Sequence, residues 1–187
     1  MDEFYDNLDK LYESGDIEAV EAFLSGAIAE TGEYTPERAG LLSSLASIHL
    51  HLGQLGVADR LVSEALEIYN TMAELSVHQT AALTIEAVLM CRKGNYQGSL
   101  NSFRQALALT KRFFGENIDF AICRRNISEV CELLGDIPSA IEEMSGAVRI
   151  MEKLLDPGHA SVKTARAELE QLMERLCYER TTSIAYK

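Results

Sequence analysis

Two histidines and two cysteines are the side chains in this sequence that are best suited to hold a metal ion. His49 and His51 stand two residues apart near the end of a predicted helix, so they point to different faces and make a poor pair of ligands. Cys123 and Cys131 are eight residues apart and can share one helix face, but no histidine pattern accompanies them. We therefore predict structural or surface roles for the histidines. The cysteines are predicted to be small buried side chains, with redox sensing as the alternative.

Sequence motifs that carry enzymatic chemistry do not occur in the chain. The patterns GxxxxGK[ST], GxGxxG and GxSxG are missing, and "GHASVK" at 158–163 has no predicted strand before it. No cysteine–histidine arrangement suggests a nucleophile, and the carboxylates fit solvated helix faces. The sequence thus predicts no catalytic residue, no cofactor and no bound metal, and it indicates a protein that is not an enzyme.

Composition and charge narrow the class of partner. Of the 187 residues, 47% are hydrophobic and 25% are charged, which is typical of a globular protein. The net charge of −12 argues against nucleic acid or an anionic membrane as the ligand, and ten acidic residues but one lysine fall within 1–34. The chain has neither a signal-peptide pattern nor an apolar run of roughly 18–20 residues. We therefore expect a cytoplasmic protein, monomer or dimer, that binds no nucleic acid and no membrane.

Any surface site must be positioned by the predicted helices, and these follow a sequence pattern that repeats along the chain. The segment GDIPSAIEEMSGAVRI at 135–150 aligns without gaps with three earlier segments, and the last three copies start 41 residues apart. Each copy opens with a glycine, predicted to end the preceding helix, and has an alanine twelve positions later: Gly15, Gly53, Gly94 and Gly135, then Ala27, Ala65, Ala106 and Ala147. Apolar or small residues recur five and nine positions after the glycine: Val20, Ala58, Ser99, Ala140, Leu24, Val62, Phe103 and Met144. These offsets share one stripe of a helix.

A second recurrence marks the start of the other helix in each unit. Thr35, Ser76 and Asn117 are 41 residues apart and suit N-cap positions, as do Asn95 and Asp136 after their glycines. These signals predict nine helices, at about 2–14, 16–31, 36–52, 54–73, 77–93, 95–114, 118–134, 136–155 and 159–178. The remaining segment, 179–187, is predicted to be a flexible tail.

This pattern resembles the tetratricopeptide repeat, and in particular the long-period subclass found in kinesin light chains and related bacterial proteins. The similarity rests on the 41-residue period and on the loops FFGENIDFA at 113–121 and LLDPGHASV at 154–162. The family's small residue in the first helix of a unit falls on Ala46, Ala87 and Ser128, whereas Leu8 and Leu169 depart from it.

The resemblance implies an all-α, right-handed superhelical solenoid in which stacked helix pairs share a core. It implies one domain over 1–178, with helix-turn-helix units at about 1–34, 35–75, 76–116 and 117–157 and a capping helix at 158–178. In such arrays the first helix of each unit lines a concave groove. The residues that the resemblance places in the groove are Asp6, Asp9, Glu13, Ser44, Ser47, Thr84, Val88, Arg92, Arg125, Asn126, Glu129 and Arg166.

One of these residues matches a specific role in the family. Asn126 stands at the position that bonds the backbone of a bound peptide in family members that grip peptides. The equivalent positions in the other units hold Ser44, Ile85 and Ala167, so a complete carboxylate clamp is not expected.

The first predicted helix carries a row of acidic side chains. Asp2, Asp6, Asp9 and Glu13 are spaced four, three and four residues apart and share one face. The row is either a device for solubility and dipole compensation or an acidic wall that faces a partner. With Arg92, Arg125 and Asn126 towards the other end, the second interpretation predicts a bound peptide with its basic part near the first helix and its acidic part near the seventh.

Together these features predict a non-enzymatic scaffold or adaptor that binds a protein or a peptide in the concave groove. Two other functions stay open. A peptide-sensing regulatory module would usually carry an effector segment, and none is visible. A small secretion or assembly chaperone would expose apolar side chains to one dedicated client.

Overall fold

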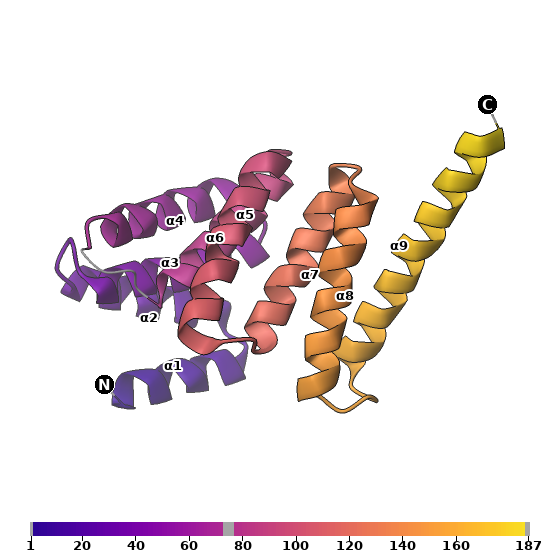
Figure 1. Ribbon diagram of the computed structural model, residues 1–187. Helices are drawn as coiled ribbons and strands as arrows, with labels where there is room; N and C mark the ends of the chain where they lie inside the picture. Colours follow the sequence, from indigo (N-terminus) through magenta and orange to yellow (C-terminus); the bar gives the residue numbers. More distant parts are fainter. Residues whose placement is uncertain (1, 73–76, 186–187) are drawn as a thin grey trace. The chain divides into compact units, whose positions relative to one another are not determined.

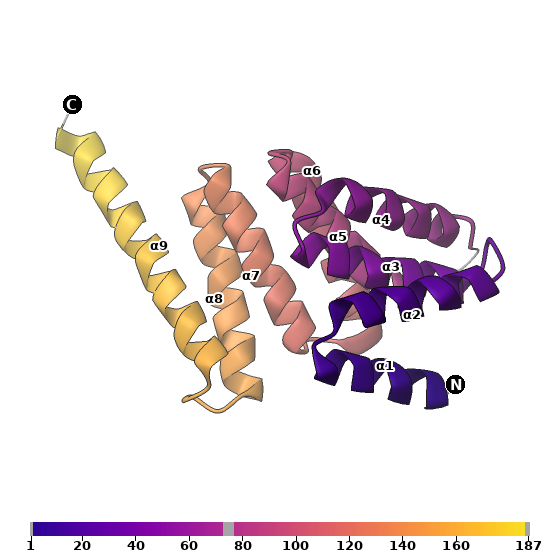
Figure 2. The same ribbon diagram turned by 180° about the vertical axis from the view of Figure 1, so that it is seen from behind.

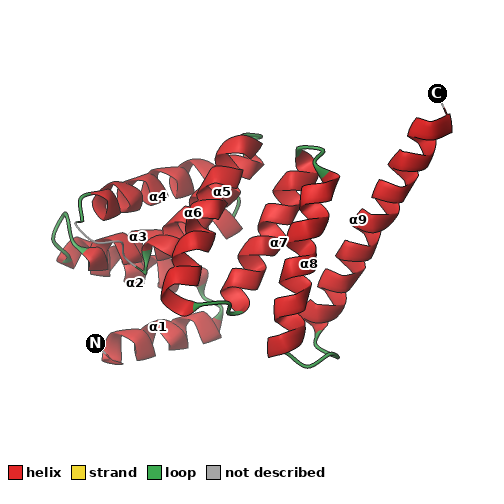
Figure 3. Ribbon diagram, viewed as in Figure 1, coloured by secondary structure: helices red, strands yellow, loops and turns green. Residues whose placement is uncertain are grey.

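Helices account for all the regular secondary structure in residues 2–72 and 77–185, the parts of the chain that the computed structural model describes (Figures 1 and 3). In chain order they are α1 (Asp2–Ser14), α2 (Ile17–Glu30), α3 (Pro36–His51), α4 (Leu55–Asn70), α5 (Gln79–Arg92), α6 (Tyr96–Phe114), α7 (Ile118–Leu133), α8 (Ile137–Leu154) and α9 (Ala160–Ala185). The prediction of nine helices is therefore confirmed for the described residues. None of these helices is both long enough and apolar enough to cross a lipid bilayer.

Side-chain caps explain where several of the helices begin. Asp16, Thr35, Asn95, Asn117 and Asp136 each accept a hydrogen bond from the backbone N–H three residues later, at 2.9–3.2 Å. Each bond satisfies a donor that the first turn of a helix leaves without a partner. The four caps predicted among these five residues are thus confirmed, while the fifth predicted cap, Ser76, lies outside the described residues.

Glycines end the helices that precede each repeated segment, as predicted. Gly15, Gly53, Gly94 and Gly135 have φ between +71° and +79°, the left-handed conformation that a side chain disfavours. Gly115, which the sequence analysis did not single out, adopts φ +72° directly after α6. The repeat therefore depends on a backbone conformation that recurs at the same place in every copy.

The end of α9 differs from the prediction. The helix continues to Ala185, whereas the sequence analysis ended it at 178, and Figure 2 shows it as one uninterrupted ribbon. No glycine or proline occurs in 179–187 to stop it. The Thr181 hydroxyl donates to the carbonyls of Cys177 and Tyr178, and Arg175 pairs with Glu179 one turn later. The predicted helix end was wrong because no breaker residue follows.

The chain divides into two compact units, Met1–Leu89 and Met90–Lys187. The first unit holds α1 to α4 and most of α5, and the second holds the end of α5 and α6 to α9. The predicted single array over 1–178 stays a prediction.

The core of the first unit forms where α1, α2 and α3 meet. Val20 and Leu24 of α2 are fully buried and cluster with the buried Leu45 and Ile48 of α3, and Leu8 and other partly buried side chains pack against this cluster. Phe4 of α1 stacks on Phe23 of α2 with ring centroids 5.0 Å apart. These contacts fix α1, and its acidic residues lie outside them.

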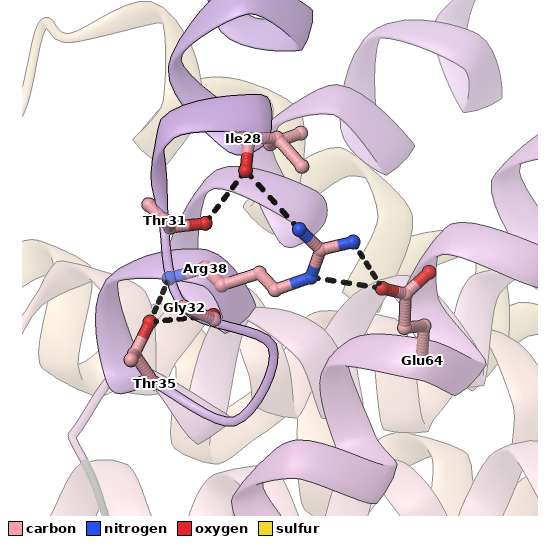
Figure 4. A network of polar contacts seen from close by, with 6 residues as sticks. All are labelled: Ile28, Thr31, Gly32, Thr35, Arg38 and Glu64. Carbon is pink, nitrogen blue, oxygen red and sulfur yellow. Dashed lines mark hydrogen bonds and ion pairs between the residues drawn. The ribbon is translucent and has the colours of Figure 1, made fainter.

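A polar network centred on Arg38 ties α2, α3 and α4 together (Figure 4). The Arg38 guanidinium donates to the Ile28 carbonyl at 3.1 Å, near the end of α2, and to Glu64 of α4 at 2.8 and 3.0 Å. Thr31 donates to the same Ile28 carbonyl at 2.7 Å, and Thr35 caps α3 through the backbone N–H of Arg38. One side chain thus satisfies a helix end and pairs with the next helix, which gives this network a structural role.

In the second unit, small residues permit polar contacts between neighbouring helices. The Ser128 hydroxyl on α7 donates to the Ala140 carbonyl on α8 at 2.7 Å. The Cys123 thiol on α7 donates to the Phe103 carbonyl on α6 at 3.4 Å. Ser128 and Ala140 are both almost fully buried, so the two backbones approach closely at this point.

The repeated positions have the burial that the alignment predicts. All the residues five and nine positions after the glycines are buried, and so are the alanines at twelve positions in the last three copies. Ala27, the equivalent residue in the first copy, is only partly buried. The first copy therefore departs from the others at this position.

The thiols give a direct test of the packing of α7. Cys123 and Cys131 are buried, and burial raises the pKa of Cys123 to about 12 and is the main cause of a raised pKa at Cys131. Both thiols thus stay neutral and unreactive at about pH 8, because the thiolate is the nucleophile. With a thiol reagent we expect slow labelling of both in the folded protein and fast labelling in denaturant, as read by mass spectrometry.

Cys177 is the internal control for this experiment, because its side chain is exposed on α9. It should label rapidly whether the protein is folded or not. Fast labelling of both Cys123 and Cys131 in the folded protein would contradict the packing of α7 and would favour the redox alternative.

Candidate functional site

An open hollow of about 440 Å³ lies among α7, α8 and α9 in the second unit. It is lined by Arg125, Ser128, Glu129 and Glu132 of α7, Met144 of α8, and Glu168, Gln171, Leu172 and Arg175 of α9. The hollow therefore offers both charged side chains and apolar surface to a ligand.

The lining follows from the period of the helix. On α7 the four residues are spaced three, one and three apart, and the four on α9 have the same spacing. Positions spaced in this way lie on one helix face, so each helix presents a single stripe. Each residue of the α9 stripe stands 43 positions after its counterpart on α7, from Arg125 and Glu168 to Glu132 and Arg175. The hollow is thus formed by matching stripes.

Two ion pairs join the stripes at their ends. Arg125 binds Glu168 through two contacts, one of them from Nε to Oε2 at 2.6 Å, which is a bidentate arrangement. At the other end, Nη1 of Arg175 lies 2.9 Å from Oε1 of Glu132, and its Nε lies 3.1 Å from Oε1 of Glu179. Both guanidiniums are therefore engaged within the protein.

The electrostatics of Arg125 agree with this geometry. Its pKa is raised, mainly by the hydrogen bond to Glu168, and the charges of Glu168 and Glu129 act in the same direction. Burial alone would lower it. The Arg125 cation is thus stabilised by its bond to Glu168 and by the nearby charge of Glu129, whose side chain is exposed.

The apolar part of the lining comes from Met144 and Leu172, each 5% exposed. The Ser128 hydroxyl is already committed to the Ala140 carbonyl. The hollow therefore has a small apolar floor with a satisfied polar group beside it, while most of its exposed lining is polar and lies at and around the two ion pairs.

The structure places the predicted groove residues of the second unit in different surroundings. Arg125 and Glu129 line the hollow, and their predicted role in a binding groove stays a prediction. Asn126 is partly buried and does not line it. Arg166 pairs with Glu152 of α8 at 2.7 Å, and Arg92 is exposed at the last residue of α5.

On α1 in the first unit, the predicted groove residues Asp6, Asp9 and Glu13 are all exposed, so the acidic face reaches solvent. The side chain of Asp2 lies outside the described residues. A partner role for this face stays a prediction.

The other predicted groove residues of the first unit are Ser44 and Ser47 on α3 and Thr84 and Val88 on α5, all partly buried. The Ser44 hydroxyl donates to the Gly40 carbonyl and the Thr84 hydroxyl to the Thr80 carbonyl, each within its own helix. Their role in binding a ligand also stays a prediction.

Several lining residues escaped the sequence analysis, namely Ser128, Glu132, Met144, Glu168, Gln171, Leu172 and Arg175. The 41-residue period matched Arg125 with Arg166, whereas in the structure Arg125 meets Glu168, two positions later. The sequence did contain a pattern that could have predicted this pairing. Arg125 and Glu168, like Glu132 and Arg175, are residues of opposite charge 43 positions apart, and on each helix the two residues lie on one face.

The two histidines have separate partners. His49 is buried, with Nδ1 2.5 Å from Oε1 of Gln54 and Nε2 3.6 Å from Oε1 of Glu21. His51 is exposed, and its Nδ1 lies 2.8 Å from the Ser47 carbonyl of its own helix. Among the described residues, no three or more histidine, cysteine, aspartate or glutamate side chains come together as metal ligands. The geometry thus gives His49 a role in helix packing.

Comparison with known proteins agrees with this architecture. Residues 87–117 match the sequence profile of the tetratricopeptide repeat family. The crystal structure of putative kinesin light chain tetratricopeptide-like repeats from Podosopora anserina is similar over 97% of this chain and 95% of that chain, with a TM-score of 0.69 at 17% identity. The chain has the tetratricopeptide repeat fold. The predicted all-α solenoid class and its resemblance to kinesin light chain-type repeats are therefore confirmed.

Other tetratricopeptide repeat structures are similar as well. BtubC from P. vanneervenii matches over 86% of this chain and 66% of its own length, with a TM-score of 0.69 at 20% identity. A signal transduction ATPase with a tetratricopeptide repeat sensor, from Pyrococcus horikoshii, matches over 95% of this chain but only 27% of its own, with a TM-score of 0.76 at 15% identity. No curated protein matches the chain by sequence.

Proposed function

We propose that this chain is a non-enzymatic module that binds a protein or peptide segment, and that the hollow among α7, α8 and α9 is one of its contact sites. The observation that carries the proposal is the pairing of two stripes from successive first helices around an open hollow of about 440 Å³. Tetratricopeptide repeat folds present such helices to their protein partners, which supports a scaffold or adaptor.

The chemistry of the hollow suits a side chain of a partner. A volume of this size is within the usual range of ligand sites, which combine an apolar lining with a few polar groups that fix orientation. Met144 and Leu172 supply the apolar surface, and the charged residues form a rim. The charged rim would set selectivity, and the small apolar floor would add contact with the apolar part of the bound side chain.

The same groups favour binding over catalysis. The lining carboxylates Glu132 and Glu168 are held in ion pairs, and the Ser128 hydroxyl is bonded to a backbone carbonyl. A nucleophile needs a base beside it, and the lining offers Ser128 no such neighbour in contact.

The charges of each unit, taken by itself, suggest what each would prefer in a partner. The acidic face of α1, with Asp6, Asp9 and Glu13, is still proposed to meet a basic part of the partner. An acidic part at α7 would have to share Arg125 with Glu168, which already takes two of the donors of the guanidinium, and it would lie close to the charge of Glu129. A neutral or basic side chain of the partner would not compete with Glu168 for Arg125.

A second candidate function is a ligand sensor within a larger signalling protein. The Pyrococcus horikoshii structure is described as carrying a tetratricopeptide repeat sensor, and this chain corresponds to 27% of that protein's length. A sensor would use the same contact surface, so the test below applies to both candidates.

The test is site-specific photo-crosslinking in the cells that produce the protein. A photoreactive amino acid placed at Gln171, which is exposed on the hollow, is expected to crosslink to a partner. The matched control is the same amino acid at Ser145, which is exposed on α8 and does not line the hollow. Partner crosslinks at least as strong from Ser145, or none from Gln171, would contradict the proposed site.

A further inference from the structure

The charges around the hollow do not balance. Among the residues that line it, two guanidiniums, of Arg125 and Arg175, face three carboxylates, of Glu129, Glu132 and Glu168. Arg125 is committed to Glu168 by two contacts, and Arg175 is shared between Glu132 and Glu179. The lining therefore has an excess of one negative charge, on a rim beside a small apolar floor.

Glu129 carries the part of this excess that a ligand can reach. Its side chain is exposed, it lines the hollow, and it forms no ion pair with any residue that the structure describes. Its charge acts on Arg125, so its carboxylate is within electrostatic reach of the ion pair at that end. A ligand group that approaches the hollow meets this carboxylate beside an arginine that is already occupied.

We propose that the hollow binds a lysine or arginine side chain of the partner segment, with its charged head at Glu129 and its aliphatic stem against Met144 and Leu172. This inference rests on the proposed function and names the partner chemistry at the same site. Long basic side chains combine an apolar stem with a cationic tip, which matches a small apolar floor beside a polar rim with an excess carboxylate.

Other side chains fit the hollow less well. An aspartate or glutamate would be repelled by Glu129, and each guanidinium that it could approach already binds at least one carboxylate. A purely apolar side chain would remove water from Glu129 without giving it a partner, which is costly for a charged group. A basic side chain avoids both penalties.

The experiment is a selection from a random-peptide library on the intact chain, followed by measurement of Kd by fluorescence anisotropy. We expect the enriched peptides to share a lysine or arginine. Replacing that residue by norleucine, which keeps the stem and removes the charge, should weaken binding roughly tenfold, and so should Glu129→Gln.

The decisive measurement is the double-mutant cycle between these two changes. If the basic side chain meets Glu129, the norleucine peptide should bind Glu129→Gln and the original protein with nearly the same Kd, because the interaction is already lost. The matched control is Glu170→Gln, which makes the same change at an exposed residue of α9 outside the hollow. This control should leave both Kd values unchanged within about twofold.

The other outcomes separate the two proposals. Two results would overturn the basic-side-chain inference without contradicting the proposed binding function. One is that enriched peptides crosslink from Gln171 but need no basic residue, and the other is that the two changes in the cycle have additive effects. A library that yields no peptide above background, together with no crosslink from Gln171, would overturn the binding site and this inference with it.

Discussion

Replacing Phe103 by alanine is expected to lower the free energy of unfolding of the second unit by about 3–5 kcal/mol. Phe103 is among the largest fully buried side chains of the described chain and is 2% exposed. It lies on α6, where its backbone carbonyl accepts a hydrogen bond from Cys123 of α7. Truncation removes its buried apolar surface and leaves a cavity in a region where α6 and α7 meet. Urea unfolding followed by circular dichroism measures the change.

The control for this prediction is Phe114→Ala at the end of the same helix. Phe114 is 54% exposed, so its truncation removes little buried surface and should change the free energy of unfolding by less than about 1 kcal/mol. Losses of similar size at both positions would mean that the repeat does not place Phe103 in a core.

Enlarging a small residue should also destabilise the protein, for the opposite reason. Ala106, twelve positions after Gly94, is 1% exposed on α6. Leucine at this position has no space, so neighbouring side chains or helices must shift, and we expect a loss of about 1–3 kcal/mol. Ala65→Leu tests the equivalent site in the first unit, where Ala65 is fully buried. Thermal and urea unfolding report both changes.

Ala108→Leu is the matched control because Ala108 is on the same helix, two residues away, and is exposed. Leucine and alanine both favour helix, so this change should stay within about 0.5 kcal/mol. Neutral results at both Ala106 and Ala65 would contradict the alignment of the repeats, since both alanines are held to be tight helix contacts.

The sequence by itself determined the helices and the faces that they bury. Gly53, Gly94 and Gly135 end helices because each adopts a left-handed conformation that other residues disfavour. Thr35 and Asn117 begin helices because their side chains accept bonds from the first turn. These are local effects, set by residues within one turn of each other, and so they can be predicted from sequence alone.

The burial of the repeated positions was predictable for a related reason. Phe103 and Ala106 recur at fixed offsets in several copies, and a stripe that repeats in this way can bury itself only against neighbouring helices. The resemblance to tetratricopeptide repeats added the expectation that successive helix pairs stack and share a core. Because the same weak local signals recur in one register, together they were enough to predict the fold.

The tertiary structure alone decided which charged side chains meet. The period of 41 residues matched Arg125 with Arg166, but Arg125 binds Glu168 and Arg166 binds Glu152. Long side chains choose partners across helices by distance and direction, and a shift of two positions moves a helix residue by more than half a turn. Sequence could show that arginines and glutamates recur on these helices. Only the packing of α7, α8 and α9 showed that the arginines are occupied and that Glu129 is left facing the hollow.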